Sequence, residues 1–182
     1  MKITVVGRGH VGGGLARLWT AAGHQVTGLG REGGDASGAD VVVVAVPGPT
    51  IADALAQVSG LAGQPAIDAC NHYGSRDDTH ASLSHQIKSI IGGPTAKSFS
   101  TNFAAAYDEI SQQRATPSNL YASDPEARTI TEQLIRDAGY EPLYVGGLTP
   151  GARLLEDSSA ITRAIAAQIG PFFYRYASPG AL

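Results

Sequence analysis

The chain has 182 residues, of which 43% are hydrophobic and 16% charged, a composition typical of a globular protein with one well-filled core. Its formal net charge of −3 gives no support to binding of nucleic acid or of an anionic membrane surface. No apolar run approaches the roughly 18 residues of a membrane span, and the single cysteine, Cys70, fits a reducing cytoplasm rather than a disulfide framework.

The first predicted element is a strand that leads directly into a glycine-rich turn. The apolar residues Ile3, Val5 and Val6 precede Gly7, Gly9 and Gly12, which form a G-x-G-x-x-G motif. In such a motif the first glycine allows a tight turn, the second a close approach of backbone to phosphate, and the third close packing of helix on strand. The motif therefore predicts a dinucleotide site, against the alternative of a glycine-rich turn that binds nothing.

A helix is predicted immediately after these glycines. Its buried face would carry Val11, Leu15, Leu18 and Ala22, which recur at helical spacing. We expect the backbone N–H of His10, in the first turn, to face the phosphates while its ring covers the cofactor, and Val11 to help fix the cofactor.

A second strand, predicted over residues 25–29, ends at Gly30 and Arg31. An NAD site usually carries Asp or Glu at this place, to bind the ribose 2′-hydroxyl. A guanidinium group suits a 2′-phosphate instead, so Arg31 predicts NADP or NADPH as the cofactor. Two alternatives remain open: Arg31 is a solvated surface residue, or Glu32 pairs with the ribose.

The connection to the third strand is too short for an ordinary crossover helix. About nine residues, 30–38, precede the continuously apolar run 41–46, whereas a parallel crossover normally takes a dozen or more. We therefore expect the second helix to be absent or a single turn, with the adenine end of the cofactor open to solvent.

Strand and helix patterns alternate along the rest of the chain. Helices are expected over residues 50–57, around Leu83, Ile87 and Ile90, and from Thr149 onward. A further helix is expected from Pro125, with Asp124 as its N-cap and Gly139 just after its end. Strands are expected at 66–69, 97–100, 119–122 and 143–145, and a polar loop at 71–78. In the last helix, Leu154, Ile161, Ile165 and Ile169 are predicted to face inward. The pattern indicates a single α/β domain, residues 1–182, with a Rossmann-like, doubly wound, mainly parallel sheet (core about 1–145) and a C-terminal helical extension (about 149–182).

These residues together resemble the NADP-binding reductases of the coenzyme F-420-dependent NADP oxidoreductase type and their small bacterial relatives. The chain is also more distantly similar to the cytoplasmic NADPH domain of six-transmembrane ferric reductases. The likeness lies in the glycine motif, in Gly23-His24, Gly30-Arg31 and Ala45-Val46-Pro47, and in residues 68–71, 97–103 and 147–156. The sequence departs from that pattern at Gly30, where the family often has Ser or Thr, and at His72 and Ser100, where relatives often have Pro and Asn.

The resemblance implies that Val46, Pro47 and Asn71 line the ribose and nicotinamide. Hydride transfer to a flavin-like ring needs no obligatory proton-transfer side chain, so no catalytic residue is assigned. Cys70 and His72 could form a thiolate–imidazole pair, although a small buried cysteine is the commoner case. No His, Cys or carboxylate set has metal-ligand spacing, so no metal is expected.

The sequence thus predicts an NADP(H)-dependent oxidoreductase that passes hydride to or from a deazaflavin, a flavin, or a small carbonyl or imine acceptor. The alternatives are a non-catalytic module that senses NADP(H), and a reductase of the hydroxyacid or pyrroline-carboxylate type. A homodimer through the C-terminal helix and the aromatic segment 172–176 is a further expectation, with packing of that segment on the chain's own core as its alternative.

Overall fold

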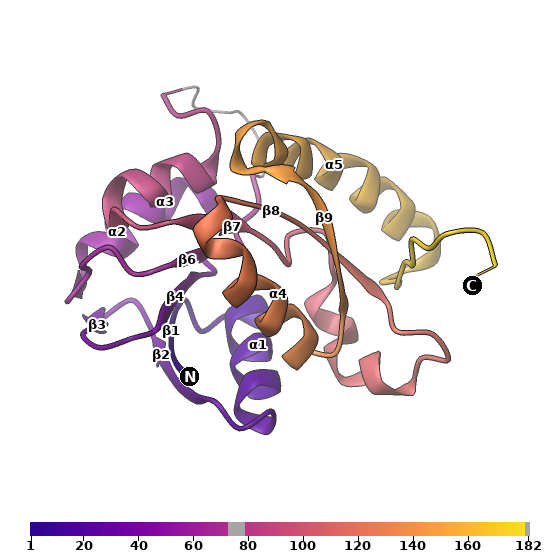
Figure 1. The fold of residues 1–182 in the computed structure, drawn as a ribbon, viewed down its shortest axis with the longest axis horizontal. Helices are drawn as coiled ribbons and strands as arrows, with labels where there is room; N and C mark the ends of the chain where they lie inside the picture. The colour runs from indigo at the N-terminus through magenta and orange to yellow at the C-terminus, as the bar shows by residue number, and fades with distance from the viewer. Residues whose placement is uncertain (73–78, 181–182) are drawn as a thin grey trace.

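A computed structural model of the chain describes residues 1–72 and 79–180. It contains a seven-stranded sheet with the order β2-β1-β4-β6-β7-β8-β9, in which β7 and β8 are antiparallel and all other neighbours are parallel (Figure 1). Most of the polar loop expected at 71–78 lies outside the described residues. The mainly parallel, Rossmann-like sheet predicted from the sequence is confirmed.

The order of the elements follows the predicted alternation. The strands are β1 (Lys2–Val6), β2 (Gln25–Leu29), β3 (Gly34–Asp35), β4 (Val41–Val44), β5 (Val58–Ser59), β6 (Ala66–Asp68), β7 (Thr95–Lys97), β8 (Ser118–Ser123) and β9 (Glu141–Gly147). The α-helices are α1 (His10–Ala21), α2 (Ile51–Ala56), α3 (Leu83–Ile91), α4 (Arg128–Asp137) and α5 (Leu148–Ile169), with short 3-10 helices η1 (Gly48–Thr50), η2 (Ala104–Gln112) and η3 (Pro125–Ala127).

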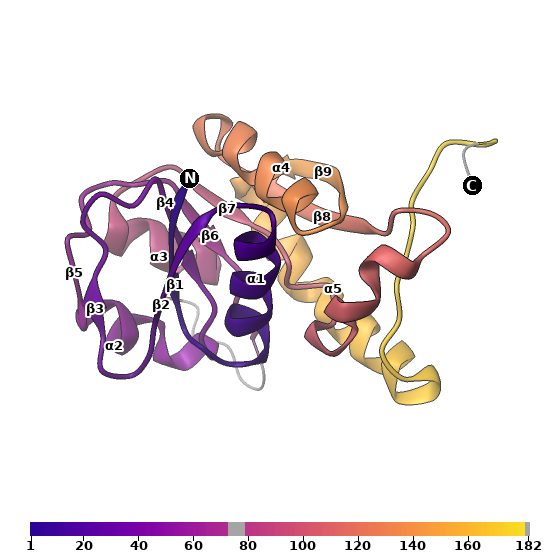
Figure 2. The same cartoon turned by 90° about the horizontal axis from the view of Figure 1, so that it is seen from below.

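Helices cover both faces of the sheet, as the uninterrupted valines of β4 require (Figure 2). One core lies between the sheet and α1, α4 and η2, and has the fully buried Trp19 among its largest side chains. The other core lies under α2 and α3 and contains Ile51, Leu55 and Ile87. Val41 and Val43 face the first core and Val42 and Val44 the second, so the central strand ties the two layers together.

The second crossover helix is absent, as its short connection predicts. Its place is taken by a turn and by β3, which pairs in parallel with β5 in a separate two-stranded sheet. Leu29, Ala36 and Val58 are buried in this region and close the edge of the second core. The short strand β3 and its partner β5 thus cover this edge in place of a crossover helix.

Some element boundaries differ from those expected. The strand expected at 97–100 is β7, which ends at Lys97, and in α3 the buried position is Ile91 rather than Ile90, which is 39% exposed. Asp124 does not cap the next helix with its side chain; its Oδ2 instead accepts from the Thr95 backbone N–H and from Lys88 Nζ. Gly139 follows α4 with φ +91°, in agreement with its expected place after the helix end.

The predicted inward face of α5 is wrong. Leu154, Ile161, Ile165 and Ile169 are between 41% and 68% exposed, while α5 packs on the sheet through Gly151, Ala152, Leu155, Glu156 and Ser159. The four residues do lie on one face of the helix, as their spacing predicts, but this apolar face points away from the sheet. Small and polar residues face inward because Gly151 sits against Ala122 of β8 and Glu156 joins a buried ionic cluster.

The segment after α5 folds back onto the chain. The rings of Phe172 and Phe103 are 5.1 Å apart, Phe173 packs against the first core, and the backbone of Ser118 donates to the Tyr174 carbonyl. Tyr176 is the exposed aromatic of the segment, at 59%. Packing on the chain's own core therefore accounts for Phe172, Phe173 and Tyr174. No helix among residues 1–72 and 79–180 has the length and apolarity to cross a bilayer.

Candidate cofactor site

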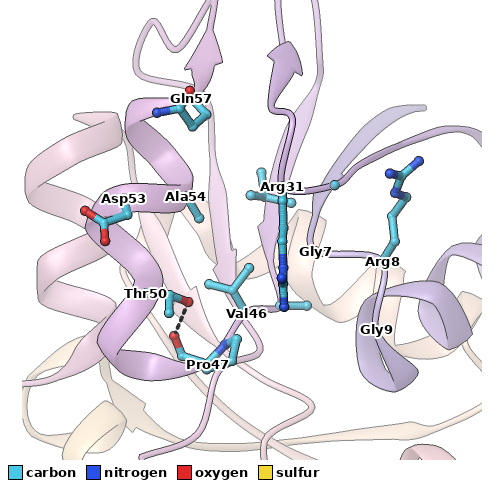
Figure 3. A pocket seen from close by; sticks show the side chains of 13 residues that line it. Gly7, Arg8, Gly9, Arg31, Val46, Pro47, Thr50, Asp53, Ala54 and Gln57 are labelled. Carbon is cyan, nitrogen blue, oxygen red and sulfur yellow. Dashed lines mark hydrogen bonds between the residues drawn. The ribbon is translucent and has the colours of Figure 1, made fainter.

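A pocket of about 710 Å³ lies where the strand order turns between β1, β2 and β4 (Figure 3). The carboxyl ends of these three strands contribute its floor and one wall, and α2 contributes the opposite wall. This crevice is the place where open α/β sheets bind their ligands. The lining residues are Val6, Gly7, Arg8, Gly9, Gly30, Arg31, Ala45, Val46, Pro47, Thr50, Asp53, Ala54 and Gln57.

The three motif glycines differ in what surrounds them. Gly7 has φ +107°, and a Cβ there would overlap the carbonyl oxygen of Ala45. A Cβ at Gly12 would overlap the carbonyl oxygen of Gly7. At Gly9, by contrast, nothing lies within 4 Å of the Cβ position. The fold thus requires glycine at 7 and 12, whereas Gly9 keeps open space on the pocket side, as backbone contact with a phosphate would need.

Helix α1 begins at His10, directly after the pocket-lining Gly9. The first backbone N–H groups of an α-helix have no partner within the helix, and with the helix dipole they favour an anion. No acidic residue occupies the first turn of α1. The end of α1 beside the pocket therefore suits a pyrophosphate group.

Arg31 lies at the tip of a tight turn that follows β2. The Gly33 N–H donates to the Gly30 carbonyl over 3.1 Å, so Arg31 and Glu32 occupy the two central turn positions. Gly33 has φ +71°, which allows the chain to reverse into β3. The Arg31 side chain is exposed and lines the pocket, extending between the glycine turn and α2 in Figure 3.

Arg8 is a pocket residue that the sequence analysis missed. Its Nη2 donates to Glu32 Oε1 over 2.5 Å, and its aliphatic stem lies 3.3 Å from a Cβ placed at Gly28. A Cβ at Gly30 would overlap its guanidinium group. Arg8 thus lies across the end of β2, over two glycines that leave room for it. Its position between Gly7 and Gly9 in the glycine motif could have indicated that it lies beside the cofactor site.

A polar face of α2 and η1 was also missed. Thr50, Asp53, Ala54 and Gln57 line the pocket and follow one another at spacings of three, one and three residues, which place them on one helical face. The hydroxyl of Thr50 donates to the Pro47 carbonyl over 2.8 Å and fixes the start of this helix (Figure 3). The same spacing is readable in the sequence.

Of the ten residues predicted to bind the cofactor, six line this pocket: Gly7, Gly9, Gly30, Arg31, Val46 and Pro47. His10, Val11, Gly12 and Asn71 lie outside its lining. His10 and Val11 are in the first turn of α1, and Gly12 supports the Gly7 turn. Asn71 follows β6, and its Nδ2 donates to the Ser100 carbonyl over 2.8 Å, which joins the chain after β6 to the chain after β7.

A buried ionic cluster lies beneath that end of the sheet. Lys97 Nζ donates to Asp68 Oδ2 over 2.9 Å and to the Cys70 carbonyl over 2.7 Å, and lies 3.7 Å from Glu156 Oε1. Ser84 donates to Asp68 over 2.6 Å. The side chains of Lys97 and Asp68 are fully buried. The cluster therefore joins β6, β7, α3 and α5, and Asp68 has a structural role within it.

Cys70 is 2% exposed, and its Sγ lies 3.4 Å from the Val44 carbonyl oxygen. Burial raises the pKa of this thiol well above its usual range, with the nearby Asp68 charge acting in the same direction. Among the described residues no hydrogen bond joins Cys70 to His72. The environment of Cys70 thus favours a neutral thiol rather than a nucleophilic thiolate.

No protein-family model matches the chain, and no curated protein matches it. Solved structures do share its fold. A candidate coenzyme F-420-dependent NADP reductase from an Arthrobacter species superposes with a TM-score of 0.82 at 22% identity, over 98% of this chain and 100% of that one.

Two larger enzymes match with lower scores. A reductive aminase from Aspergillus terreus, in complex with NADPH, has a TM-score of 0.67 at 16% identity, over 93% of this chain and 62% of its own. A pyrroline carboxylate reductase from Plasmodium falciparum, with NADP bound, has a TM-score of 0.58 at 12% identity, over 93% and 64%. The chain therefore shares its fold with these three structures.

Proposed function

We propose that the protein is an NADP(H)-dependent oxidoreductase. The observation that carries the proposal is the pocket between β1, β2 and β4, which combines an open glycine turn, a helix N-terminus and the exposed guanidinium of Arg31. The residues fit the cofactor. Gly9 and the start of α1 would hold the pyrophosphate, and Arg31 would bind the 2′-phosphate. Val46 and Pro47 would form the apolar floor of the pocket. The NADP-containing structures with the same fold support this reading.

The bound nicotinamide would supply hydride, and we propose that a deazaflavin or flavin accepts it. The full-length match to a candidate coenzyme F-420-dependent reductase supports this acceptor class. So does the chemistry beneath the ends of β6 and β7. Reduction of a carbonyl or imine requires a proton donor at the reacting atom, whereas the proton that a reduced flavin takes up can come from water. Asp68 and Lys97 are engaged with each other, and burial raises the pKa of the Cys70 thiol, so these three groups are poor proton donors. The protein's own work is to hold two rings together and exclude water.

The test measures the oxidation of NADPH by its absorbance in the presence of four hydride acceptors, each tried separately: coenzyme F-420, FMN, a cyclic imine and a keto acid. We expect turnover with coenzyme F-420 or FMN. Turnover with the imine or keto acid alone would instead support the pyrroline-carboxylate or hydroxyacid type. Tight NADPH binding with no turnover on any acceptor would support a sensing module.

We also propose that α5 pairs with α5 of a second copy of the chain. Leu154, Ile161, Ile165 and Ile169 are separated by seven, four and four residues, so they form one apolar face that is distinct from the face on the sheet. Contiguous exposed apolar surface of this kind marks an interaction site. A two-fold pairing covers the same stripe on both copies at once, so a second copy is the occupant we favour.

A further inference from the structure

We infer that Arg8 acts with Arg31 to set the selectivity of the pocket for a 2′-phosphate over a 2′-hydroxyl, and that it does so by neutralising Glu32 as well as by binding the phosphate. This inference rests on the NADP(H) function proposed above and deepens it. It assigns a role to the Arg8–Glu32 ion pair, which borders the carboxyl end of β2, where the ribose of a dinucleotide is bound in this fold.

Glu32 is the residue that would otherwise favour NADH. It occupies the turn after β2, where a carboxylate accepts a hydrogen bond from the ribose 2′-hydroxyl and repels a phosphate. In this protein its Oε1 instead accepts from Arg8 Nη2 over 2.5 Å. Arg8 therefore cancels the charge that opposes a 2′-phosphate and occupies the acceptor that a 2′-hydroxyl would use.

Arg8 is also placed to contact the phosphate itself. It lines the same pocket as Arg31, and its stem crosses Gly28 and Gly30 on the strand that Arg31 follows. The guanidinium fills the volume that any side chain at position 30 would take. The absence of a side chain at Gly30 thus makes room for a second cation. Arginine binds phosphate through several N–H groups at once, which a hydroxyl cannot do.

The pair is weak enough to be rearranged by a ligand. The side chains of Arg8 and Glu32 are 58% and 62% exposed, and exposed ion pairs contribute little to stability. A doubly charged phosphate can therefore share the Arg8 guanidinium with Glu32, through N–H groups that Glu32 does not use, at small cost to stability. The same exposure means that substitutions at either position leave the fold intact.

The test is the affinity for NADPH and for NADH, measured by titration calorimetry, in the wild type and three variants: Arg8→Gln, Glu32→Gln and the double variant. For Arg8→Gln we expect NADPH to bind about ten- to a hundredfold more weakly, and NADH severalfold more tightly, because Glu32 is released. For Glu32→Gln we expect tighter NADPH binding. In the double variant the gain for NADH should disappear, which separates the release of Glu32 from a general loss of positive charge.

Arg17→Gln is the matched control. Arg17 is also exposed and ion-paired, with Asp108 at 2.8 Å, but it lies outside the pocket lining, so both affinities should stay at the wild-type values. If the wild type prefers NADPH and Arg8→Gln leaves both affinities within about twofold, the role of Arg8 is overturned while the proposed function stands. If the wild type binds neither nucleotide, or prefers NADH, the proposed function fails first and this inference fails with it.

Discussion

The ammonium group of Lys97 lies 2.9 Å from the Asp68 carboxylate, and both side chains are fully buried. A second carboxylate, that of Glu156, is 3.7 Å from the same ammonium and accepts from the Leu83 backbone N–H over 2.8 Å. One cation thus holds two buried carboxylates that come from β6 and α5. This arrangement fixes α5 to the sheet and explains why a polar face of that helix points inward.

Lys97→Met should lower the free energy of unfolding by about 3–5 kcal/mol, because it leaves buried carboxylates without their cation. Urea denaturation measures the change. Lys88→Met is the control: Lys88 pairs with Asp124 at 2.7 Å but is 45% exposed, so its loss should cost less than about 1 kcal/mol. Equal effects of the two substitutions would contradict the structural role of the buried cluster.

Gly9→Ala should leave stability almost unchanged and weaken cofactor binding. Nothing in the protein lies within 4 Å of the Cβ position at Gly9, so the new methyl group meets only the space assigned to the pyrophosphate. We expect a change below about 1 kcal/mol in unfolding free energy and at least a tenfold loss of NADPH affinity, by denaturation and fluorescence titration.

Gly12→Ala is the contrasting substitution, because its Cβ would overlap the Gly7 carbonyl oxygen. It should destabilise the fold itself. Unaltered NADPH affinity in Gly9→Ala would show that the phosphates do not approach this turn.

The glycine turn and α1 could be predicted because every feature that defines them is local. The site around Arg8 could not. Arg8 meets Gly30 and Glu32 only because β1 and β2 pair in parallel with Val6 beside Leu29, a register that periodicity does not reveal. The same holds for α5: the spacing of Leu154, Ile161 and Ile165 defines a stripe, but which face is buried depends on the distant Lys97 and Ala122.

Acid should weaken the protein partly through Glu132. The Tyr121 hydroxyl donates to this carboxylate, as do Arg128 over 3.0 Å and Arg136 over 3.2 Å. These hydrogen bonds lower the pKa of Glu132, and the bond from Tyr121 has the largest effect. A lowered folded-state pKa stabilises the fold above the unfolded value of about 4.3, and this contribution is lost as pH falls through the folded-state pKa.

Glu132→Gln should therefore be less stable than the wild type at neutral pH, with the difference shrinking at acidic pH below about 4.3. Denaturation curves across this range measure the difference. A gap between the two proteins that stays constant with pH would contradict the assignment.

Ile161→Lys should convert a dimer to a monomer. Ile161 is 64% exposed at the middle of the α5 stripe, and a charge there would be buried between two copies. Light scattering after size-exclusion chromatography measures the mass. Ala167→Lys, six residues along and on a different side of the helix, should remain dimeric. A monomeric wild type would exclude the pairing of α5 with itself.

Binding of NADP(H) in the pocket between β1, β2 and β4 is measured by fluorescence titration of the wild type and Arg31→Met with NADPH and NADH. Arg31 is exposed at the tip of its turn, so its loss should not disturb the fold. We predict that the wild type binds NADPH at least tenfold more tightly than NADH, and that Arg31→Met loses most of this preference while its NADH affinity is unchanged. Equal or tighter binding of NADH by the wild type would show that the pocket is not built for a 2′-phosphate and that Arg31 does not bind one.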